Sequence, residues 1–281
     1  YIILVWYQSG LRALRQLLSS YKKEDPNTEN ECALPLIVFK YMLFNTVTIK
    51  NKHMGLLAMG ALFFAMRSCE YLKVRNPEAK QTKLLCIKNF QFFKKNKALD
   101  KRKEDISKAD YMAITFEAQK NGEKCQTIVQ HKNNRTLCPV QAWSKLIKLI
   151  LSYENTNEGT SINYYECDNN KPAYISVEDL ITHIRATCAT IGTEKLGFLP
   201  SKAGTHSIRS SFAMQLFLAN IKDFIIMLMG RWKSLSFLKY IRPQIQQFAM
   251  GLSKIMTEGT STHFQVSHVR KNVIRTRLFH S

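Results

Sequence analysis

The sequence has 281 residues, enough to bury a sizeable core, and hydrophobic residues make up 45% of it, which excludes an intrinsically disordered chain. Lysine and arginine number 41 against 21 acidic residues, so the formal net charge is +20. This excess favours a polyanionic partner, nucleic acid first and an anionic membrane surface second. The seven cysteines form no Cys-x-x-Cys pair, which argues against a disulfide framework or a zinc module and favours a reducing compartment.

The first 33 residues divide into an apolar stretch and a polar one. Four leucines between residues 11 and 18 form one stripe, which predicts a helix over residues 1–20. Residues 21–33 are polar, contain one proline and indicate a linker. Because the chain starts at Tyr1 rather than Met, and one helix is too little for a domain, we expect the sequence to be a fragment.

Two apolar helices are predicted next, over residues 34–46 and about 53–71. The second is so apolar that we expect it in the core, although its longest uncharged run, residues 54–66, is too short to span a bilayer. Arg67 and Glu70 lie three residues apart at its end. A charged pair at the end of a buried helix is either a structural ion pair or a functional site on a rigid scaffold.

A charged run, residues 94–108, is interpreted as a solvated loop that could also lie along a phosphate backbone. Two strands, 111–118 and 125–131, then flank Lys-Asn-Gly-Glu at 120–123. Asn-Gly is a strong hairpin signal, because both central positions of a type I′ turn need a positive φ. Lys120 therefore lies at the hairpin tip or one step before it.

Helices are also predicted from Leu137 to about Tyr153, with Trp143 in the core, and from Ser176, a helix cap, to Ile191. Together with the hairpin, these elements predict an α+β protein that is mainly helical and has a small antiparallel β-sheet.

The stretch 204–240 carries the main candidate functional residues. Its Gly-Thr-His-Ser-Ile-Arg segment places His206 and Arg209 on one face of a helix start. An arginine offers a fork of fixed donors, and free N–H groups at a helix start add to it, so this pair indicates an anion site. Tyr240 follows in a segment whose other face is apolar, and its phenol could attack phosphorus. Taken singly, each residue is more simply a helix-start or packing residue.

The order and spacing of these motifs resemble the tyrosine recombinase (phage integrase) family, in which His-x-x-Arg precedes a nucleophilic tyrosine by about thirty residues. Gly-Arg-Trp-Lys-Ser at 230–234 and Phe-Leu-Lys-Tyr-Ile-Arg at 237–242 are most similar to eukaryotic Crypton-type transposon recombinases. Ala-Met-Arg-Ser-Cys-Glu-Tyr-Leu at 65–72 resembles the first family box, Arg-x-x-Glu, and Gln-Lys-Asn-Gly at 119–122 resembles its hairpin-lysine element. The resemblance covers about residues 34–255 and implies the catalytic-domain fold of that family.

The resemblance implies a role for each matched residue. Arg67 and Arg209 would hold the phosphate oxygens, Lys120 would be the general acid, and Tyr240 would form a 3′-phosphotyrosyl link. His206 would assist proton transfer from the tyrosine or hold the phosphate.

Five further residues receive roles from the same resemblance. Glu70 would be a supporting acid, and Lys124, Lys233 and Arg242 would contact DNA. The family has His or Trp nine residues before the nucleophile, and this chain departs from that pattern: Arg231 fits by register and Trp232 by residue type, so both stay candidates.

The resemblance further implies a DNA strand transferase from a mobile element, independent of metal, ATP and any other cofactor. Double-stranded DNA would be its partner, a tetramer on DNA its assembly and the nucleus its location, with no membrane contact. Residues 1–20 would end a truncated DNA-clamping domain, 21–33 would be a linker, 34–257 the catalytic domain and 258–281 a basic tail. Two alternatives remain: a DNA-binding module without catalysis, and an enzyme like a type IB topoisomerase.

Overall fold

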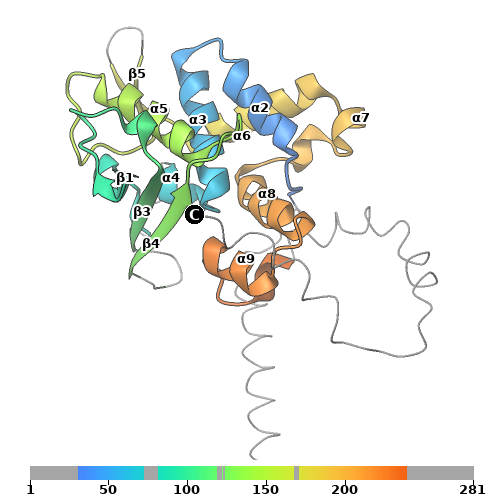
Figure 1. Cartoon of the computed structure of the whole chain (residues 1–281). Coiled ribbons are helices and arrows are strands. Elements are labelled where there is room, and N and C mark those ends of the chain that lie inside the picture. The colour runs from blue at the N-terminus through green and yellow to red at the C-terminus, as the bar shows by residue number, and fades with distance from the viewer. Residues whose placement is uncertain (1–30, 73–81, 119–121, 123, 168–170, 239–281) are drawn as a thin grey trace, which may run out of the picture. The chain divides into compact units, whose positions relative to one another are not determined.

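The chain divides into two units, of which the first is Tyr1–Arg242. The computed structural model describes most of the first unit, namely residues 31–72, 82–118, 122, 124–167 and 171–238 (Figure 1). The predicted helix over residues 1–20, most of the predicted linker and the predicted basic tail lie outside the described residues.

Helices make up about half of the described part of the chain, and α3 lies at their centre, in contact with α2, α5, α6 and α8. Every residue of α3 from His53 to Leu62 is buried, as expected for a helix that is apolar all round. A Cβ atom on Gly60 would run into the indole of Trp143, so the glycine lets α3 and α5 approach closely. The helices are α2 Leu36–Phe44, α3 Ile49–Phe63, α4 Ser68–Tyr71, α5 Pro139–Leu151, α6 Val177–Ile191, α7 Thr193–Leu196, α8 Thr205–Leu218 and α9 Asp223–Gly230.

The helix predicted over residues 53–71 is wrong as one continuous element, because α3 ends at Phe63 and α4 begins only at Ser68. Ala65 takes a left-handed conformation with φ 44°, and the Met66 N–H donates to the Ala61 carbonyl at 3.0 Å. This 6→1 bond is the Schellman way to end a helix, and glycine usually occupies its left-handed position. The sequence signals no break here because alanine favours helix.

The main sheet is antiparallel throughout, with strand order β2-β1-β3-β4 (Figure 1). The predicted hairpin is confirmed, since β3 pairs with β4 with Tyr111 opposite His131; most of its turn, including Lys120, lies outside the described residues. One face of β1 and β3 is buried, and Phe90 is one of its side chains. The centroid of the Phe90 ring lies 4.5 Å from that of Trp143. The strands are β1 Phe90–Lys94, β2 Lys97–Ala98, β3 Tyr111–Ala118 and β4 Lys124–His131.

The described residues also form a second, two-stranded sheet, which consists of β5 Tyr164–Glu166 and β6 Pro172–Tyr174. The predicted class, mainly helical α+β with a small antiparallel sheet, is confirmed. The predicted cap is also confirmed: the Ser176 hydroxyl accepts from the Asp179 N–H at 3.1 Å, and the Asp179 carboxylate accepts from the Ser176 N–H at 3.0 Å. Among the described helices, none is both long and apolar enough to cross a membrane.

Candidate active site

Three segments far apart in the sequence meet at the turn that follows α3. Arg209 of α8 donates from Nη1 to the Ala65 carbonyl at 2.5 Å and from Nη2 to the Gly230 carbonyl at 2.7 Å. Arg231, directly after α9, donates from Nη2 to the carbonyls of Phe64 at 3.2 Å and Ala65 at 3.3 Å. The left-handed turn is therefore held by two guanidinium groups, and it in turn positions Arg67.

Glu70 is the anionic centre of this cluster and is 1% exposed. Its carboxylate accepts from Arg231 Nη1 at 2.8 Å and Nη2 at 2.9 Å, and from the Arg67 N–H at 2.9 Å and Nη1 at 3.1 Å. A buried carboxylate needs such pairing, because it has lost its hydration. Burial raises the pKa of Glu70, but the charge and hydrogen bonds of Arg231, followed by the charges of Arg67 and Arg209, lower the pKa below its usual value. Glu70 is therefore an ionised, fixed partner for the arginines.

Arg231 adopts a backbone conformation that is unusual for a residue with a side chain, with φ 58° and ψ 41°. The Trp232 N–H donates to the Met227 carbonyl at 3.0 Å, so α9 also ends in a Schellman turn, with an arginine where glycine is usual. This conformation costs about 1 kcal/mol or more for a non-glycine residue. The guanidinium offsets that cost through Glu70 and through the Phe116 ring, whose centroid lies 3.7 Å from Cζ.

Trp232 lies over the other arginine of the cluster. The Arg209 Cζ is 4.3 Å from the centroid of the half-buried indole, which also contacts Phe237 at 5.5 Å between ring centroids. A Cβ atom on Gly230 would run into the Trp232 ring, so glycine is needed for this packing. Trp232 and the Gly230 carbonyl together fix the plane of the Arg209 guanidinium.

Solvent exposure separates the three arginines. The side chain of Arg67 is 18% exposed, whereas that of Arg231 is 0% exposed and Arg209 is 3% exposed as a residue. Arg67 is thus the member of the trio that a phosphate could reach directly. Arg231, which fitted the third family box by register, is turned toward Glu70, and Trp232, which fitted by residue type, lies on Arg209.

The start of α8 differs from the expected anion site. His206 is half-buried in its first turn, but the Ser207 N–H is not free, because it donates to the carboxylate of Glu31 at 3.0 Å. A Cβ atom on Gly204 would run into the same carboxylate. An acidic side chain at a helix N-terminus is electrostatically favourable, so Glu31 occupies the place predicted for a bound anion. No local sequence pattern predicts this contact, because Glu31 lies 176 residues before Ser207.

The remaining predicted residues are either exposed or lie outside the described residues. Lys124, at the start of β4, and Lys233 are exposed. Lys120, Tyr240 and Arg242 lie outside the described residues. Within the part of the chain that the structure describes, no group of three His, Cys, Asp or Glu side chains could hold a metal ion.

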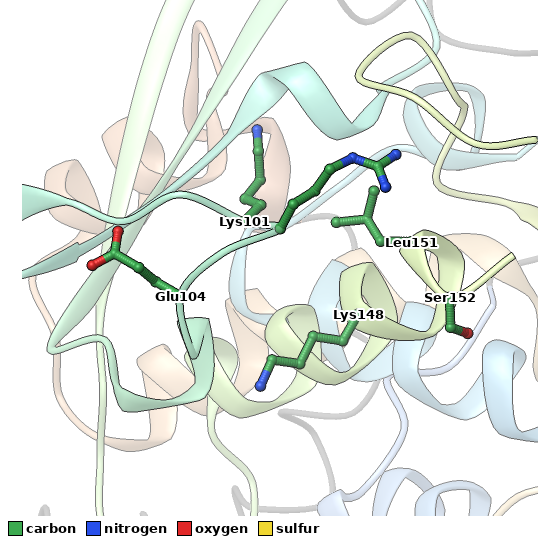
Figure 2. Close-up of a pocket in the computed structure, with 6 residues that line it drawn as sticks. Lys101, Glu104, Lys148, Leu151 and Ser152 are labelled. Carbon is green, nitrogen blue, oxygen red and sulfur yellow. The ribbon is translucent and has the colours of Figure 1, made fainter. Parts of the chain in front are cut away.

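Figure 2 shows a separate cavity of about 340 Å³ beside α5. Its cationic side chains are already engaged: Lys101 Nζ binds the carbonyl of Phe90 at 3.0 Å and the Glu158 carboxylate at 2.7 Å, and Lys148 binds Asp105. None of the predicted site residues lines this cavity, so it does not belong to the arginine cluster. Its lining residues are Lys101, Arg102, Glu104, Lys148, Leu151 and Ser152.

Comparison with known proteins gives structural likeness only. A scan against protein-family models and a search of curated proteins both return no match. Among solved structures, the XerH site-specific recombinase bound to palindromic difH substrate is 17% identical, with a TM-score of 0.49, 82% of this chain covered and 56% of that chain. The Tn1549 transposon integrase in complex with transposon right end DNA is 12% identical, with a TM-score of 0.44; the match covers 82% of this chain and 70% of the integrase chain. The XerA recombinase is 12% identical, with a TM-score of 0.46; the match covers 85% of this chain and 68% of the XerA chain. The chain therefore spans little more than half the length of XerH, and likeness at this level carries no argument about its activity.

Proposed function

We propose that this chain is a DNA strand transferase of the tyrosine recombinase kind. The observation that carries the proposal is the convergence of three motifs predicted from sequence, Arg67 with Glu70, His206 with Arg209, and Gly230 with Trp232. In the structure, Arg209 bonds Gly230 and the turn before Arg67, and Arg231 bonds Glu70. Fixed cationic donors of this kind stabilise the charge that develops on a phosphodiester in its transition state.

The proposed reaction transfers a phosphoryl group twice. The Tyr240 oxygen attacks phosphorus, His206 takes or relays the phenolic proton, and the bond to the 5′-oxygen breaks. Lys120 protonates that oxygen, which leaves a 3′-phosphotyrosyl link and a free 5′-hydroxyl. The hydroxyl of a partner strand then attacks the link and releases Tyr240. Covalent storage of the bond energy makes ATP unnecessary.

In this proposal the three arginines have different tasks. Arg67 is solvent-accessible and binds a non-bridging phosphate oxygen. Arg209, which is oriented by two carbonyls and the Trp232 ring, holds the turn that positions Arg67. Trp232 fills the third family position, since its ring is half-buried at the edge of the cluster. Arg231 is a positioning residue that acts through Glu70, because its side chain is fully buried and bound to that carboxylate.

The finer features of the proposal rest on the sequence resemblance. They are an origin in a Crypton-like mobile element, a tetramer on double-stranded DNA and a nuclear location. Lys124, Lys233 and Arg242 would contact the DNA backbone, and binding should weaken steeply with salt as several phosphates are neutralised.

A suicide-substrate assay tests the proposal. The protein is incubated with nicked duplex DNA and denatured, and a covalent protein–DNA adduct is mapped by peptide sequencing. We expect an adduct at Tyr240 that is lost in Tyr240→Phe and kept in Tyr174→Phe, a matched change on β6. An adduct in the Tyr240→Phe variant would reject the nucleophile.

The same assay separates the alternatives. Salt-sensitive DNA binding without an adduct on a broad pool of sequences would favour a binding module. An adduct with supercoil relaxation but no joining of partner strands would favour an enzyme like a type IB topoisomerase.

A further inference from the structure

One end of the main sheet carries a row of aromatic rings on its outward face. Phe93 of β1 lies opposite Tyr111 of β3, and Tyr111 lies opposite His131 of β4, so these three side chains share one face of three neighbouring strands. Phe93 and Tyr111 are half-buried and His131 is exposed, whereas Phe92 and Met112, one position along, are fully buried on the other face. The row therefore faces away from the core.

Two rings of this row are stacked, and the third is tilted by 42° against its neighbour. The planes of Phe93 and Tyr111 lie 10° apart with centroids 4.8 Å apart, and the His131 ring follows at 5.3 Å from Tyr111. The Tyr111 hydroxyl donates to the Asn96 side-chain oxygen at 3.2 Å, which ties the row to the turn between β1 and β2. Cross-strand aromatic pairs stabilise sheets, but their half-exposed rings also offer planar apolar surface to a ligand.

Lysines surround this row at the same end of the sheet. The turn that joins β1 to β2 has two central residues, Lys95 and Asn96, with φ 47° and 63°, the signs of a type I′ turn. Lys94 and Lys97 pair across it and are exposed, although alternation along the strands places both on the face opposite Phe93. Lys95, at the tip of the turn, is also exposed. The Lys95 N–H donates to the Asp110 carboxylate at 2.8 Å, which fixes the tip. Exposed Lys108 and Lys132 flank the next strands.

We propose that the outward face formed by Phe93, Tyr111 and His131, bordered at the end of the sheet by the tip lysines Lys94, Lys95 and Lys97, binds single-stranded nucleic acid. Aromatic platforms beside cationic side chains are the combination that binds single strands, since bases stack on the rings while phosphates lie against the lysines. A duplex does not offer its base faces, because they are stacked within it. Charge complementarity favours the same partner, as the whole chain carries +20.

This surface is distinct from the candidate active site. Phe116, which lies against Arg231, is also on β3, but it is five positions from Tyr111 and therefore points to the opposite face of the sheet. The turn between β3 and β4 is at the far end of these strands from the β1–β2 turn. The inference does not rest on strand cleavage, and failure of the adduct assay would leave it standing.

Binding of short oligonucleotides to the full chain tests the inference. Fluorescence polarisation compares a labelled twelve-nucleotide thymidine strand with an abasic strand of the same length and charge. We expect at least about tenfold tighter binding of the thymidine strand, the contribution of one or more stacked bases. Equal affinity for the two strands would overturn the inference. A uridine ribonucleotide strand, with its own abasic control, identifies whether RNA or DNA is preferred; either preference supports the surface.

Matched variants locate the binding on the molecule. His131→Ala and Phe93→Leu should bring the thymidine-to-abasic affinity ratio toward one, and Tyr111→Phe, which keeps the ring, should preserve the ratio. His131 is exposed on an edge strand, so its removal leaves the fold measurable by circular dichroism even if Phe93→Leu does not fold. The inference would be overturned if a folded double variant, His131→Ala with Phe93→Leu, kept the thymidine-to-abasic affinity ratio unchanged. If the double variant is unfolded, an unchanged ratio in His131→Ala alone would overturn it.

Charge variants test the lysines separately. Changing Lys94, Lys95 and Lys97 together to Gln should weaken both strands by a similar factor of about ten or more, because phosphate contacts do not depend on the base. The control changes three exposed lysines on other elements, Lys145, Lys195 and Lys222, to Gln and removes the same total charge. An equal loss in this control would show a general charge effect and overturn the proposed location.

Discussion

Removal of the Arg231 guanidinium should destabilise the fold by an amount that depends on what replaces it. Arg231→Ala leaves Glu70 buried with only Arg67 as a charged hydrogen-bond partner in the cluster. Arg231→Gly removes the same group and also the Cβ atom that makes a φ of 58° unfavourable. The two variants therefore separate the ion pair from the backbone strain.

The magnitudes follow from burial. Breaking a buried ion pair by removing one partner costs about 3–5 kcal/mol, and the partly exposed Arg67 still holds one side of the carboxylate. We therefore expect Arg231→Ala to lower the free energy of unfolding by about 3 kcal/mol. Arg231→Gly should lower it by about 2 kcal/mol, because a left-handed residue without a Cβ regains about 1 kcal/mol.

Urea unfolding followed by circular dichroism measures both free energies. Arg135→Ala, at an exposed position, is the matched control and should change stability by less than about 0.5 kcal/mol. In a Glu70→Gln background, Arg231→Ala should cost at least about 1 kcal/mol less than in the unaltered chain, since the two side chains are coupled. A glycine variant no more stable than the alanine variant would refute the strain argument, and a cost below about 1 kcal/mol for Arg231→Ala would refute the buried pair.

Three further predictions concern the site and its scaffold. Gly230→Ala should displace the Trp232 ring, which in the proposed function occupies the third family position. Adduct formation should then fall by roughly 10² while DNA affinity is kept, because loss of one transition-state donor has an effect of that size. An unchanged adduct yield would contradict this prediction. Burial, and then the charge of Lys52, lowers the pKa of His53 from 6.5 to about 4, so between these values the unfolded chain binds a proton that the folded chain does not. Stability should be full above pH 6.5 and fall by roughly 1.4 kcal/mol per pH unit toward pH 4, and His53→Gln should flatten that part of a urea-unfolding pH profile. Ser176→Ala should cost about 1 kcal/mol in thermal unfolding through loss of the α6 cap, and a cost near zero would show that the cap bond is not needed.

Local chemistry was enough to predict the elements that depend on near neighbours. The Asn-Gly signal predicted the β3–β4 hairpin, and Ser176 as a helix cap predicted the start of α6. The apolar run around Trp143 predicted a core helix, and that side chain is fully buried. These features follow from backbone preferences and from hydrophobic periodicity, both of which act within a few residues.

The sequence by itself also determined which residue types are present at the candidate site and in which order they occur, because Arg67, Glu70, His206, Arg209 and the Gly-Arg-Trp motif can be read from it directly. Their tasks were decided only by the tertiary structure. Arg231 lies 161 residues from Glu70, and the turn at Ala65 is stabilised by an arginine 144 residues away. A broken helix, a buried guanidinium and a carboxylate at the start of α8 all depend on partners brought together by folding. No local pattern specifies such partners, because the desolvation that makes their pairing necessary exists only once the core has closed.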